Sequence, residues 1–153
     1  MNKFTKLKSG IKKVKLGKNC KLIEPVNLYE CKIGNSVFIG PFVEIQKNVK
    51  VGDNTRVQSH TFICEKVSIG KNCFISHGSM FVNDLAEKGM VNRDPKKFKK
   101  TTLGDNVIIG SNSTILPVNI AKNIVVGAGS VVTKDLSIRG IYVGNPAKLL
   151  TRL

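Results

Sequence analysis

The chain has 153 residues, of which 25 are Lys or Arg and 10 are Asp or Glu, so its formal charge is +15. A hydrophobic content of 41% with only 6% aromatics is enough for one domain with an aliphatic core. No stretch is apolar enough for a membrane span or a signal peptide, so we expect a cytoplasmic protein without integral membrane contact. The charge favours an anionic partner, and because most lysines are scattered, we expect a phosphorylated small molecule and no nucleic acid.

Residues 1–15 have apolar side chains at Phe4, Leu7, Ile11 and Val14, with lysines between them. This spacing also fits a short amphipathic helix for an acidic membrane surface. Gly10 disfavours a helix of this length, so we expect an irregular N-terminal cap instead.

Residues 16–82 and 103–138 show a six-residue repeat, which fits neither a helix nor a simple alternating strand. Nine consecutive apolar residues are spaced by six: Ile33, Ile39, Ile45, Val51, Val57, Ile63, Ile69, Ile75 and Phe81. The residues four places after the first eight are small or β-branched, as a narrow interior requires: Val37, Val43, Val49, Thr55, Thr61, Val67, Cys73 and Ser79. The apolar series continues through Ile109, Ile115, Ile120, Val126, Val132 and Ile138.

Gly and Asn recur together after every third hexapeptide, as in Gly52 to Asn54 and Gly70 to Asn72. Both residue types tolerate positive φ, so we interpret this position as the same tight corner of a stacked triangular prism. Three hexapeptides then form one coil, and the sequence predicts an all-β parallel β-helix of about six coils. One-residue deletions shorten a coil near Cys31 and another after Ile115.

Two segments depart from the repeat, an inserted loop at residues 83–102 and a C-terminal tail at residues 139–153. Long insertions in compact domains tend to be functional, so the loop is either a flap over an anionic ligand or neighbouring subunit, or an ordinary solvated loop. Its basic residues are Lys88, Arg93, Lys96, Lys97, Lys99 and Lys100.

The four cysteines, Cys20, Cys31, Cys64 and Cys73, show no CxxC pair and no zinc-type spacing. We interpret them as small buried thiols of a reducing compartment. A prism of the γ-carbonic anhydrase type would need three histidines for zinc, and the chain has two. We therefore expect no metal.

Outward-facing polar residues single out the middle coils as the reactive zone. Glu65 and Asn83 are 18 residues apart, so they stack on one face of neighbouring coils, and His60 and His77 stack on another face with an offset of one residue. Each histidine taken singly also fits an ordinary corner residue.

Two groups of motifs resemble the hexapeptide-repeat acyltransferase superfamily. The runs from Val57 to Glu65 and from Phe74 to Leu85 resemble N-acyltransferases of 3-amino sugars linked to UDP or dTDP. The runs Val125 to Asp135 and Val143 to Lys148 resemble the coenzyme A end of the whole superfamily. This resemblance implies a left-handed winding, an acetyl-CoA donor, a nucleotide-linked amino sugar, and a homotrimer with active sites between subunits.

The resemblance also implies roles for individual residues near the sugar. Asn83 would orient the amine, with His77 or His60 as proton acceptor or sugar contact, because an unprotonated amine needs orientation more than deprotonation. The substrate-binding candidates are Glu65, Asp84 and Arg93.

For the cofactor, the resemblance places Gly110 and Ala128 along the pantetheine groove of coenzyme A. Thr133, Lys134 and Arg152 would meet its phosphates. Arg152 also fits a solvated surface cation.

Two other functions stay open. One is an O-acetyltransferase acting on a sugar or small acceptor, in which a histidine takes the proton that a hydroxyl must lose. The other is a non-catalytic β-helical binding module, which would have no affinity for coenzyme A.

Overall fold

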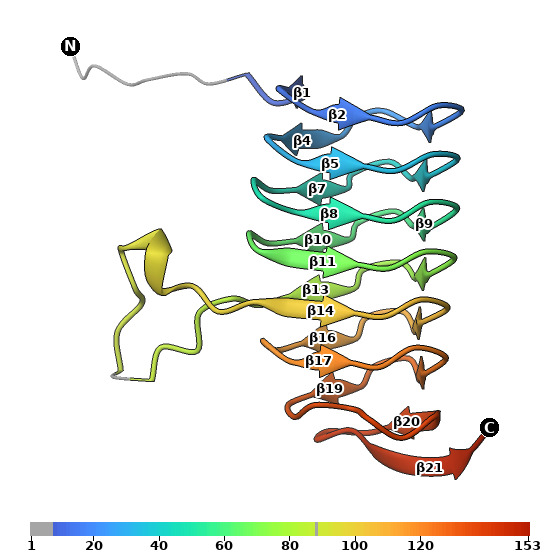
Figure 1. Cartoon of the computed structure of the whole chain (residues 1–153). Helices are drawn as coiled ribbons and strands as arrows, with labels where there is room; N and C mark the ends of the chain where they lie inside the picture. The colour runs from blue at the N-terminus through green and yellow to red at the C-terminus, as the bar shows by residue number, and fades with distance from the viewer. Residues whose placement is uncertain (1–7, 88) are drawn as a thin grey trace.

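The computed structural model describes residues 8–87 and 89–153, and it consists of very short strands wound into three parallel sheets. The sheets stack coil upon coil to form the prism in Figure 1, which confirms the predicted all-β fold. Phe4, Leu7 and Lys88 lie outside the described residues. Ile11, which the helical alternative included, lies in a strand.

Sheet A has seven strands: β1 (Ile11–Lys12), β4 (Asn27–Tyr29), β7 (Glu44–Ile45), β10 (Phe62–Ile63), β13 (Met80–Phe81), β16 (Thr114–Ile115) and β19 (Val131–Val132). Sheet B has six: β2 (Lys15–Leu16), β5 (Lys32–Ile33), β8 (Lys50–Val51), β11 (Val67–Ile69), β14 (Thr101–Leu103) and β17 (Asn119–Ile120). Sheet C has eight: β3 (Lys21–Leu22), β6 (Phe38–Ile39), β9 (Arg56–Val57), β12 (Phe74–Ile75), β15 (Ile108–Ile109), β18 (Val125–Val126), β20 (Gly140–Val143) and β21 (Lys148–Arg152).

The winding is left-handed. With the N-terminal coil at the top, the chain runs to the right along sheet B at the front and returns to the left behind it as it descends (Figure 1). The strand register keeps equivalent residues above one another, for example Ile45 beside Ile63. All pairings are parallel except the last, between β20 and β21.

The prism interior is filled by the predicted repeat positions. All nine apolar residues from Ile33 to Phe81 and all eight residues at the second inward position are buried. Short aliphatic and hydroxyl side chains fit the narrow interior, and the buried hydroxyls donate to backbone carbonyls, as Thr55 does to Gly70 at 2.9 Å.

The recurring Gly and Asn lie at the corner between sheets B and C, here called the glycine edge. We expected positive φ to require both residue types, but this holds only for the asparagines. Asn54 and Asn72 have positive φ, but the glycines before them do not. A Cβ atom on Gly52 would lie 2.6 Å from the backbone of Gly70. The glycines are therefore required because successive coils touch backbone to backbone at this edge.

The last inward position was predicted incorrectly. Ile138 is 46% exposed, whereas Leu136 is buried and bridges to Ile120. The step from Ile120 to Leu136 is two residues shorter than a full coil, and this third shortening moves the inward position from residue 138 to residue 136. Strands also occur on both sides of the range 16–138, since β1 joins β4 and β20 joins β18.

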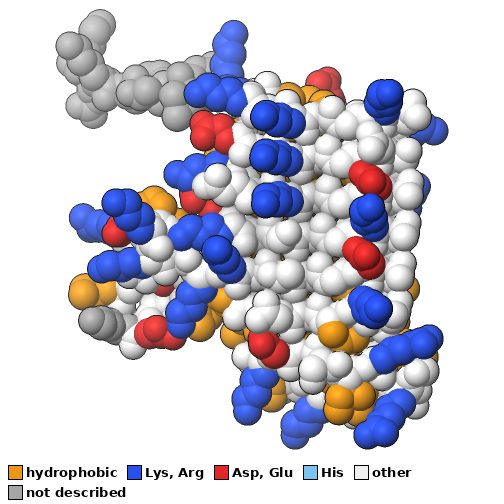
Figure 2. Space-filling model, in the orientation of Figure 1, with side chains coloured by type: hydrophobic (Ala, Val, Ile, Leu, Met, Phe, Trp, Pro, Cys, Tyr) orange, Lys and Arg blue, Asp and Glu red, His pale blue; other side chains and the backbone are white. Residues whose placement is uncertain are grey.

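The inserted segment leaves the prism after β13 and returns at β14, with a single 3₁₀ turn, η1 (Pro95–Lys97). It stands away from the prism body in Figure 1, and Lys and Arg side chains gather on it in Figure 2. Among the described residues, no helix is long and apolar enough to cross a membrane.

Candidate functional site

The two pairs of predicted site residues, three catalytic candidates and the substrate-binding candidate Glu65, lie along opposite edges of sheet A. Strand β10 runs between His60 and Glu65, and β13 runs between His77 and Asn83. We call the corner between sheets C and A, with His60 and His77, the histidine edge. The corner between sheets A and B, with Glu65 and Asn83, is the asparagine edge. The outer face of sheet A therefore lies between them, and its exposed Met80 gives this face an apolar part.

The histidine edge has two exposed imidazoles with different partners. The Nδ1 atom of His77 lies 2.8 Å from the hydroxyl oxygen of Ser59 in the coil above. If Nδ1–H donates to Ser59, the Nε2 atom of His77 can accept a proton. The ring of His60 stacks on Phe42, with centroids 4.8 Å apart.

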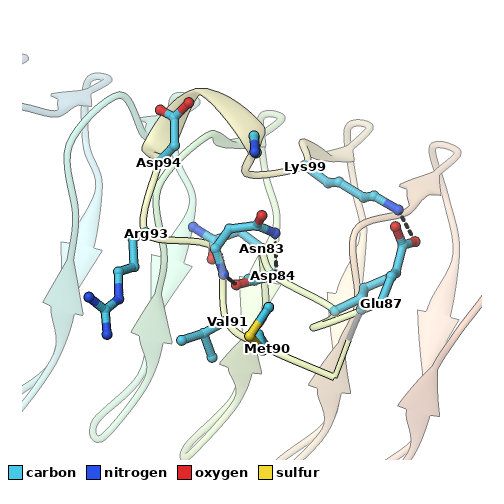
Figure 3. Close-up of a pocket in the computed structure, with 11 residues that line it drawn as sticks. Asn83, Asp84, Glu87, Met90, Val91, Arg93, Asp94 and Lys99 are labelled. Carbon is cyan, nitrogen blue, oxygen red and sulfur yellow. Dashed lines mark hydrogen bonds and ion pairs between the residues drawn. The ribbon is translucent and has the colours of Figure 1, made fainter.

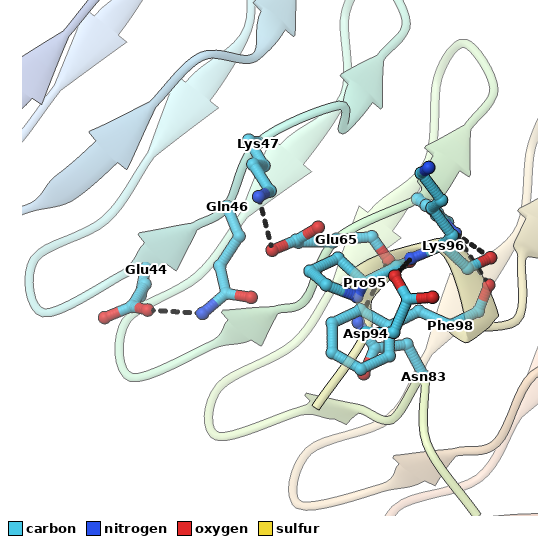
Figure 4. A network of polar contacts seen from close by, with 10 residues as sticks. Glu44, Gln46, Lys47, Glu65, Asn83, Asp94, Pro95, Lys96 and Phe98 are labelled. Carbon is cyan, nitrogen blue, oxygen red and sulfur yellow. Dashed lines mark hydrogen bonds and ion pairs between the residues drawn. The ribbon is translucent and has the colours of Figure 1, made fainter. Parts of the chain in front are cut away.

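The asparagine edge holds Asn83 at the root of the inserted loop (Figure 4). The side-chain amide of Asn83 donates to the backbone carbonyl of Glu65 at 3.4 Å. The backbone carbonyl of Asn83 accepts from the backbone N–H of Lys99 at 2.9 Å. Glu65 forms an ion pair with Lys47 at 3.4 Å. Within the described chain, no hydrogen bond occupies the Asn83 Oδ1 atom, so this oxygen can accept a hydrogen bond from a ligand.

The loop encloses a pocket of about 550 Å³ that opens beside Asn83. Figure 3 shows Asn83 and Asp84 together in this pocket, with Arg93 extending outward from its rim. The structure thus brings together three of the predicted residues. The lining consists of Asn83, Asp84, Leu85, Glu87, Met90, Val91, Asn92, Arg93, Asp94, Lys97 and Lys99.

Asp84 shapes this pocket from within the loop. Its Oδ1 accepts from the Ala86 N–H at 3.0 Å and from the Asn92 side-chain amide at 2.9 Å, and its Oδ2 accepts from the Asn92 N–H. The backbone N–H of Asn92, followed by that of Ala86, holds the pKa of this carboxyl below its ordinary value. Because both oxygens are already engaged, Asp84 fixes the loop conformation in this structure.

Lys66 is a residue of the site that the sequence did not reveal. Its ammonium group donates to the carbonyls of Pro95, Lys96 and Phe98 at 2.6, 3.0 and 3.0 Å. These contacts fasten the 3₁₀ turn to the asparagine edge. The sequence contains one local signal for this role, a lysine at a corner position of the repeat. The φ of Lys66 is 67°, a conformation that Asn or Gly adopts more easily than Lys.

The predicted cofactor residues do not form a single pocket within the chain. Gly110 and Ala128 continue the histidine edge towards the C-terminus, and they touch, since a Cβ atom on Gly110 would lie 2.3 Å from the Ala128 nitrogen. Thr133 and Lys134 are exposed on the asparagine edge after β19. Arg152 is exposed on β21, the last strand of sheet C, which pairs antiparallel with β20.

Three cysteines belong to the core. Cys31, Cys64 and Cys73 are buried, and burial raises the pKa of Cys31 to about 11 and that of Cys64 to about 12. In residues 8–87 and 89–153, no group of three or more His, Cys, Asp or Glu side chains is placed to hold a metal ion.

Comparison with known proteins supports this architecture. Residues 30–65 match the bacterial transferase hexapeptide model, and residues 100–134 match the hexapeptide repeat of succinyl-transferase. The bifunctional protein GlmU of Clostridium botulinum is 38% identical over 108 residues, which is 70% of this chain and 21% of GlmU. The chain thus spans about a fifth of the length of the curated relatives it matches.

Two solved structures share the fold over most of the chain. A variant of AntD, an N-acyltransferase from Bacillus cereus in complex with dTDP and coenzyme A, superposes with a TM-score of 0.81 and 25% identity, covering 90% of this chain and 83% of AntD. A variant of perosamine N-acetyltransferase from Caulobacter crescentus superposes with a TM-score of 0.68 and 18% identity. The superposition covers 90% of this chain and 57% of the perosamine N-acetyltransferase chain. The repeat and the fold are those of hexapeptide-repeat acyltransferases.

Proposed function

We propose that the chain is an acyl-CoA-dependent N-acetyltransferase that acetylates the amine of a UDP- or dTDP-linked amino sugar for surface-glycan precursor synthesis. The observation with most weight is the asparagine edge, where the Asn83 amide stands at the mouth of the loop pocket with its Oδ1 available. The likeness to AntD over 90% of the chain supports the same activity.

The proposed chemistry fits an amide better than a base. The amine binds unprotonated and donates a hydrogen bond to Asn83 Oδ1, which aims the nitrogen lone pair at the thioester carbonyl carbon. A C–N bond forms, collapse of the tetrahedral adduct breaks the C–S bond, and the amine proton leaves with the thiolate as free coenzyme A. No step requires Asn83 to take a proton.

The donor would lie along the C-terminal part of the prism. Ala128 is exposed and Gly110 is partly exposed, and these small residues leave room at this edge for a narrow chain such as pantetheine. Lys134 and Arg152 are exposed cations suited to the phosphates of coenzyme A. The basic loop around Arg93 and Lys97 would attract the diphosphate of the acceptor.

The active form is proposed to be a homotrimer. The loop stands away from its own prism (Figure 1), so its pocket can face the histidine edge of a neighbouring copy. Such an arrangement would bring Asn83 of one copy near His77 of the next. Light scattering should give three times the 16.7 kDa chain mass, and a monomer that is fully active would contradict this assembly.

A thiol-release assay tests the activity. Acetyl-CoA is mixed with UDP- and dTDP-linked 3-amino and 4-amino sugars, and the matched hydroxyl sugars serve as controls. Coenzyme A release only with amino sugars is the expected result. Release only with the hydroxyl sugars would overturn the proposal.

One observation favours a second candidate, an O-acetyltransferase. The 2.8 Å contact between Ser59 and His77 can orient the imidazole as a general base for a hydroxyl acceptor. In that case the hydroxyl sugars in the same assay are the substrates, and replacing His77 with Asn abolishes turnover.

A further inference from the structure

A second cavity, of about 240 Å³, lies at the N-terminal end of the outer face of sheet A. Phe42 forms one side of it, and Asn27 and Glu44 lie on the neighbouring strands β4 and β7. None of these residues was singled out by the sequence.

Phe42 has an unusual backbone conformation for an aromatic residue. Its φ is 60°, and the residue is 57% exposed. At the same corner, other coils place His60, Gly78, Asn112 and Gly129, which are residue types that adopt positive φ more readily. A bulky aromatic residue in this conformation is strained. Because Phe42 is largely exposed, burial of its side chain offsets little of that strain.

The ring of Phe42 is suited to stacking on its free side. His60 stacks against Phe42, but His60 is not part of the cavity lining. The ring therefore meets the cavity away from His60. A planar aromatic ligand placed there would extend the existing stack.

Polar groups at the cavity present an acceptor beside a donor. Glu44 Oε2 accepts from the Asn27 side-chain amide at 3.1 Å. Its Oε1 accepts from the Gln46 side-chain amide at 2.9 Å (Figure 4). Each carboxylate oxygen can accept a second hydrogen bond, and the Asn27 amide has a second N–H. This pair complements a ring that presents an N–H next to a carbonyl.

The cavity lies on the same face as the proposed reaction site. Asn27, Glu44, Phe62 and Met80 are consecutive neighbours across sheet A. Two strand spacings, roughly 10 Å, separate Glu44 from the coil of Met80 and Asn83. A ligand that follows this face would join the cavity to the two edges.

We propose that this cavity binds the nucleobase of the acceptor, and that the base is uracil or thymine. The ring stacks on Phe42, its N3–H donates to Glu44, and a ring carbonyl accepts from Asn27. Cytosine and adenine lack the ring N–H, so they do not match this pair. Guanine presents the same N–H and carbonyl but carries a further exocyclic amine, and the proposed UDP- or dTDP-linked substrate favours a pyrimidine. This inference rests on the proposed nucleotide-linked substrate.

Calorimetric titration with UDP, dTDP, CDP and GDP is the test. UDP and dTDP should bind at least about tenfold more tightly than CDP or GDP. Phe42→Asn should weaken UDP binding by about 5- to 100-fold, the value of one base stack, while coenzyme A affinity stays unchanged. Because Asn accepts positive φ, this variant should keep or raise the Tm, so lost binding would not reflect unfolding.

Two further variants sharpen the test. Glu44→Gln should reduce the preference for UDP over CDP, since an amide can donate to the cytosine ring nitrogen. Phe38→Ala is the matched control, because Phe38 lies on sheet C in the same coil, under the Arg56 guanidinium at 4.3 Å. It should leave nucleotide affinity unchanged.

The outcomes separate this inference from the proposed function. Wild-type UDP affinity in Phe42→Asn, or tighter binding of GDP or CDP than of UDP, would overturn the base site even if amino sugars are acetylated. Selective UDP binding that is lost in Phe42→Asn would support the site even if no amine is acetylated, in which case only the transfer reaction would be wrong.

Discussion

The coil stack and the inserted loop are held together by different forces. In the stack, equivalent inward positions are filled by apolar side chains with almost no exposure. Backbone hydrogen bonds link each coil to the next. In the loop, Asp84 and Lys66 hold the backbone through polar contacts, and most side chains are exposed. The comparison indicates that the stack fixes the position of Asn83, whereas polar contacts that can be removed singly set the shape of the pocket beside it.

The largest expected effect follows from Phe81, which is 1% exposed inside the prism. Phe81→Ala should lower the free energy of unfolding by about 3–5 kcal/mol, because it removes a fully buried ring and leaves a cavity. Phe98→Ala in the loop is the control and should change the Tm far less. Thermal denaturation of both variants is the measurement, and equal losses would show that the loop is part of the cooperative core.

The buried thiols give the second effect. Burial raises the pKa of Cys31 to about 11 and of Cys64 to about 12, so their thiolate fractions at pH 8 are reduced by roughly two to three orders of magnitude. Alkylation of the native protein, followed by peptide mass mapping, should label the partly exposed Cys20 first. Rapid labelling of Cys64 would mean that the coil around it opens readily.

Loss of the loop anchor should have a smaller, local effect. Lys66→Met removes three hydrogen bonds from a lysine ammonium and should favour loop opening by on the order of 1 kcal/mol. Limited proteolysis should then cut within residues 83–102 several times faster, at an almost unchanged Tm. Lys71→Met at the glycine edge is the control, and faster loop cleavage in that variant would contradict the specific role of Lys66.

The smallest effect concerns Asp84 and pH. The folded-state pKa of Asp84 lies below the ordinary value of 3.8 for this carboxyl. Its hydrogen bonds therefore stabilise the loop fully at any pH above 3.8, and this stabilisation is lost as the pH falls through the lower folded-state pKa. Hydrogen exchange of residues 84–93 should speed up in that acidic range. Asp84→Asn should loosen the same segment at neutral pH and remove the pH dependence, and an unchanged exchange profile in this variant would contradict the assignment.

The sequence predicted the stack well because its packing is periodic. An inward residue such as Ile75 is identified from its spacing alone, and the 18-residue step also places Asn83 beneath Glu65. The same method failed at Ile138, because a coil shortened by two residues moves the inward position from residue 138 to residue 136.

Other parts of the site could not be predicted because they depend on a non-repeating backbone. The sequence identified Asp84, but only the loop conformation shows that its carboxylate bonds to Asn92 and Ala86. Lys66 was missed because its acceptors are carbonyls, which no sequence motif specifies. Phe42 resembles any surface aromatic until its positive φ and the cavity beside it are seen.

The most direct test of the account compares the two edges of sheet A. The measurement is kcat/KM for coenzyme A release with an accepted nucleotide-linked amino sugar, for the wild type, Asn83→Ala and His77→Asn. We expect Asn83→Ala to lower kcat/KM by about 100-fold through loss of amine orientation, and His77→Asn to lower it by less than about tenfold. A full loss in His77→Asn with wild-type activity in Asn83→Ala would contradict the account and place the chemistry on the histidine edge.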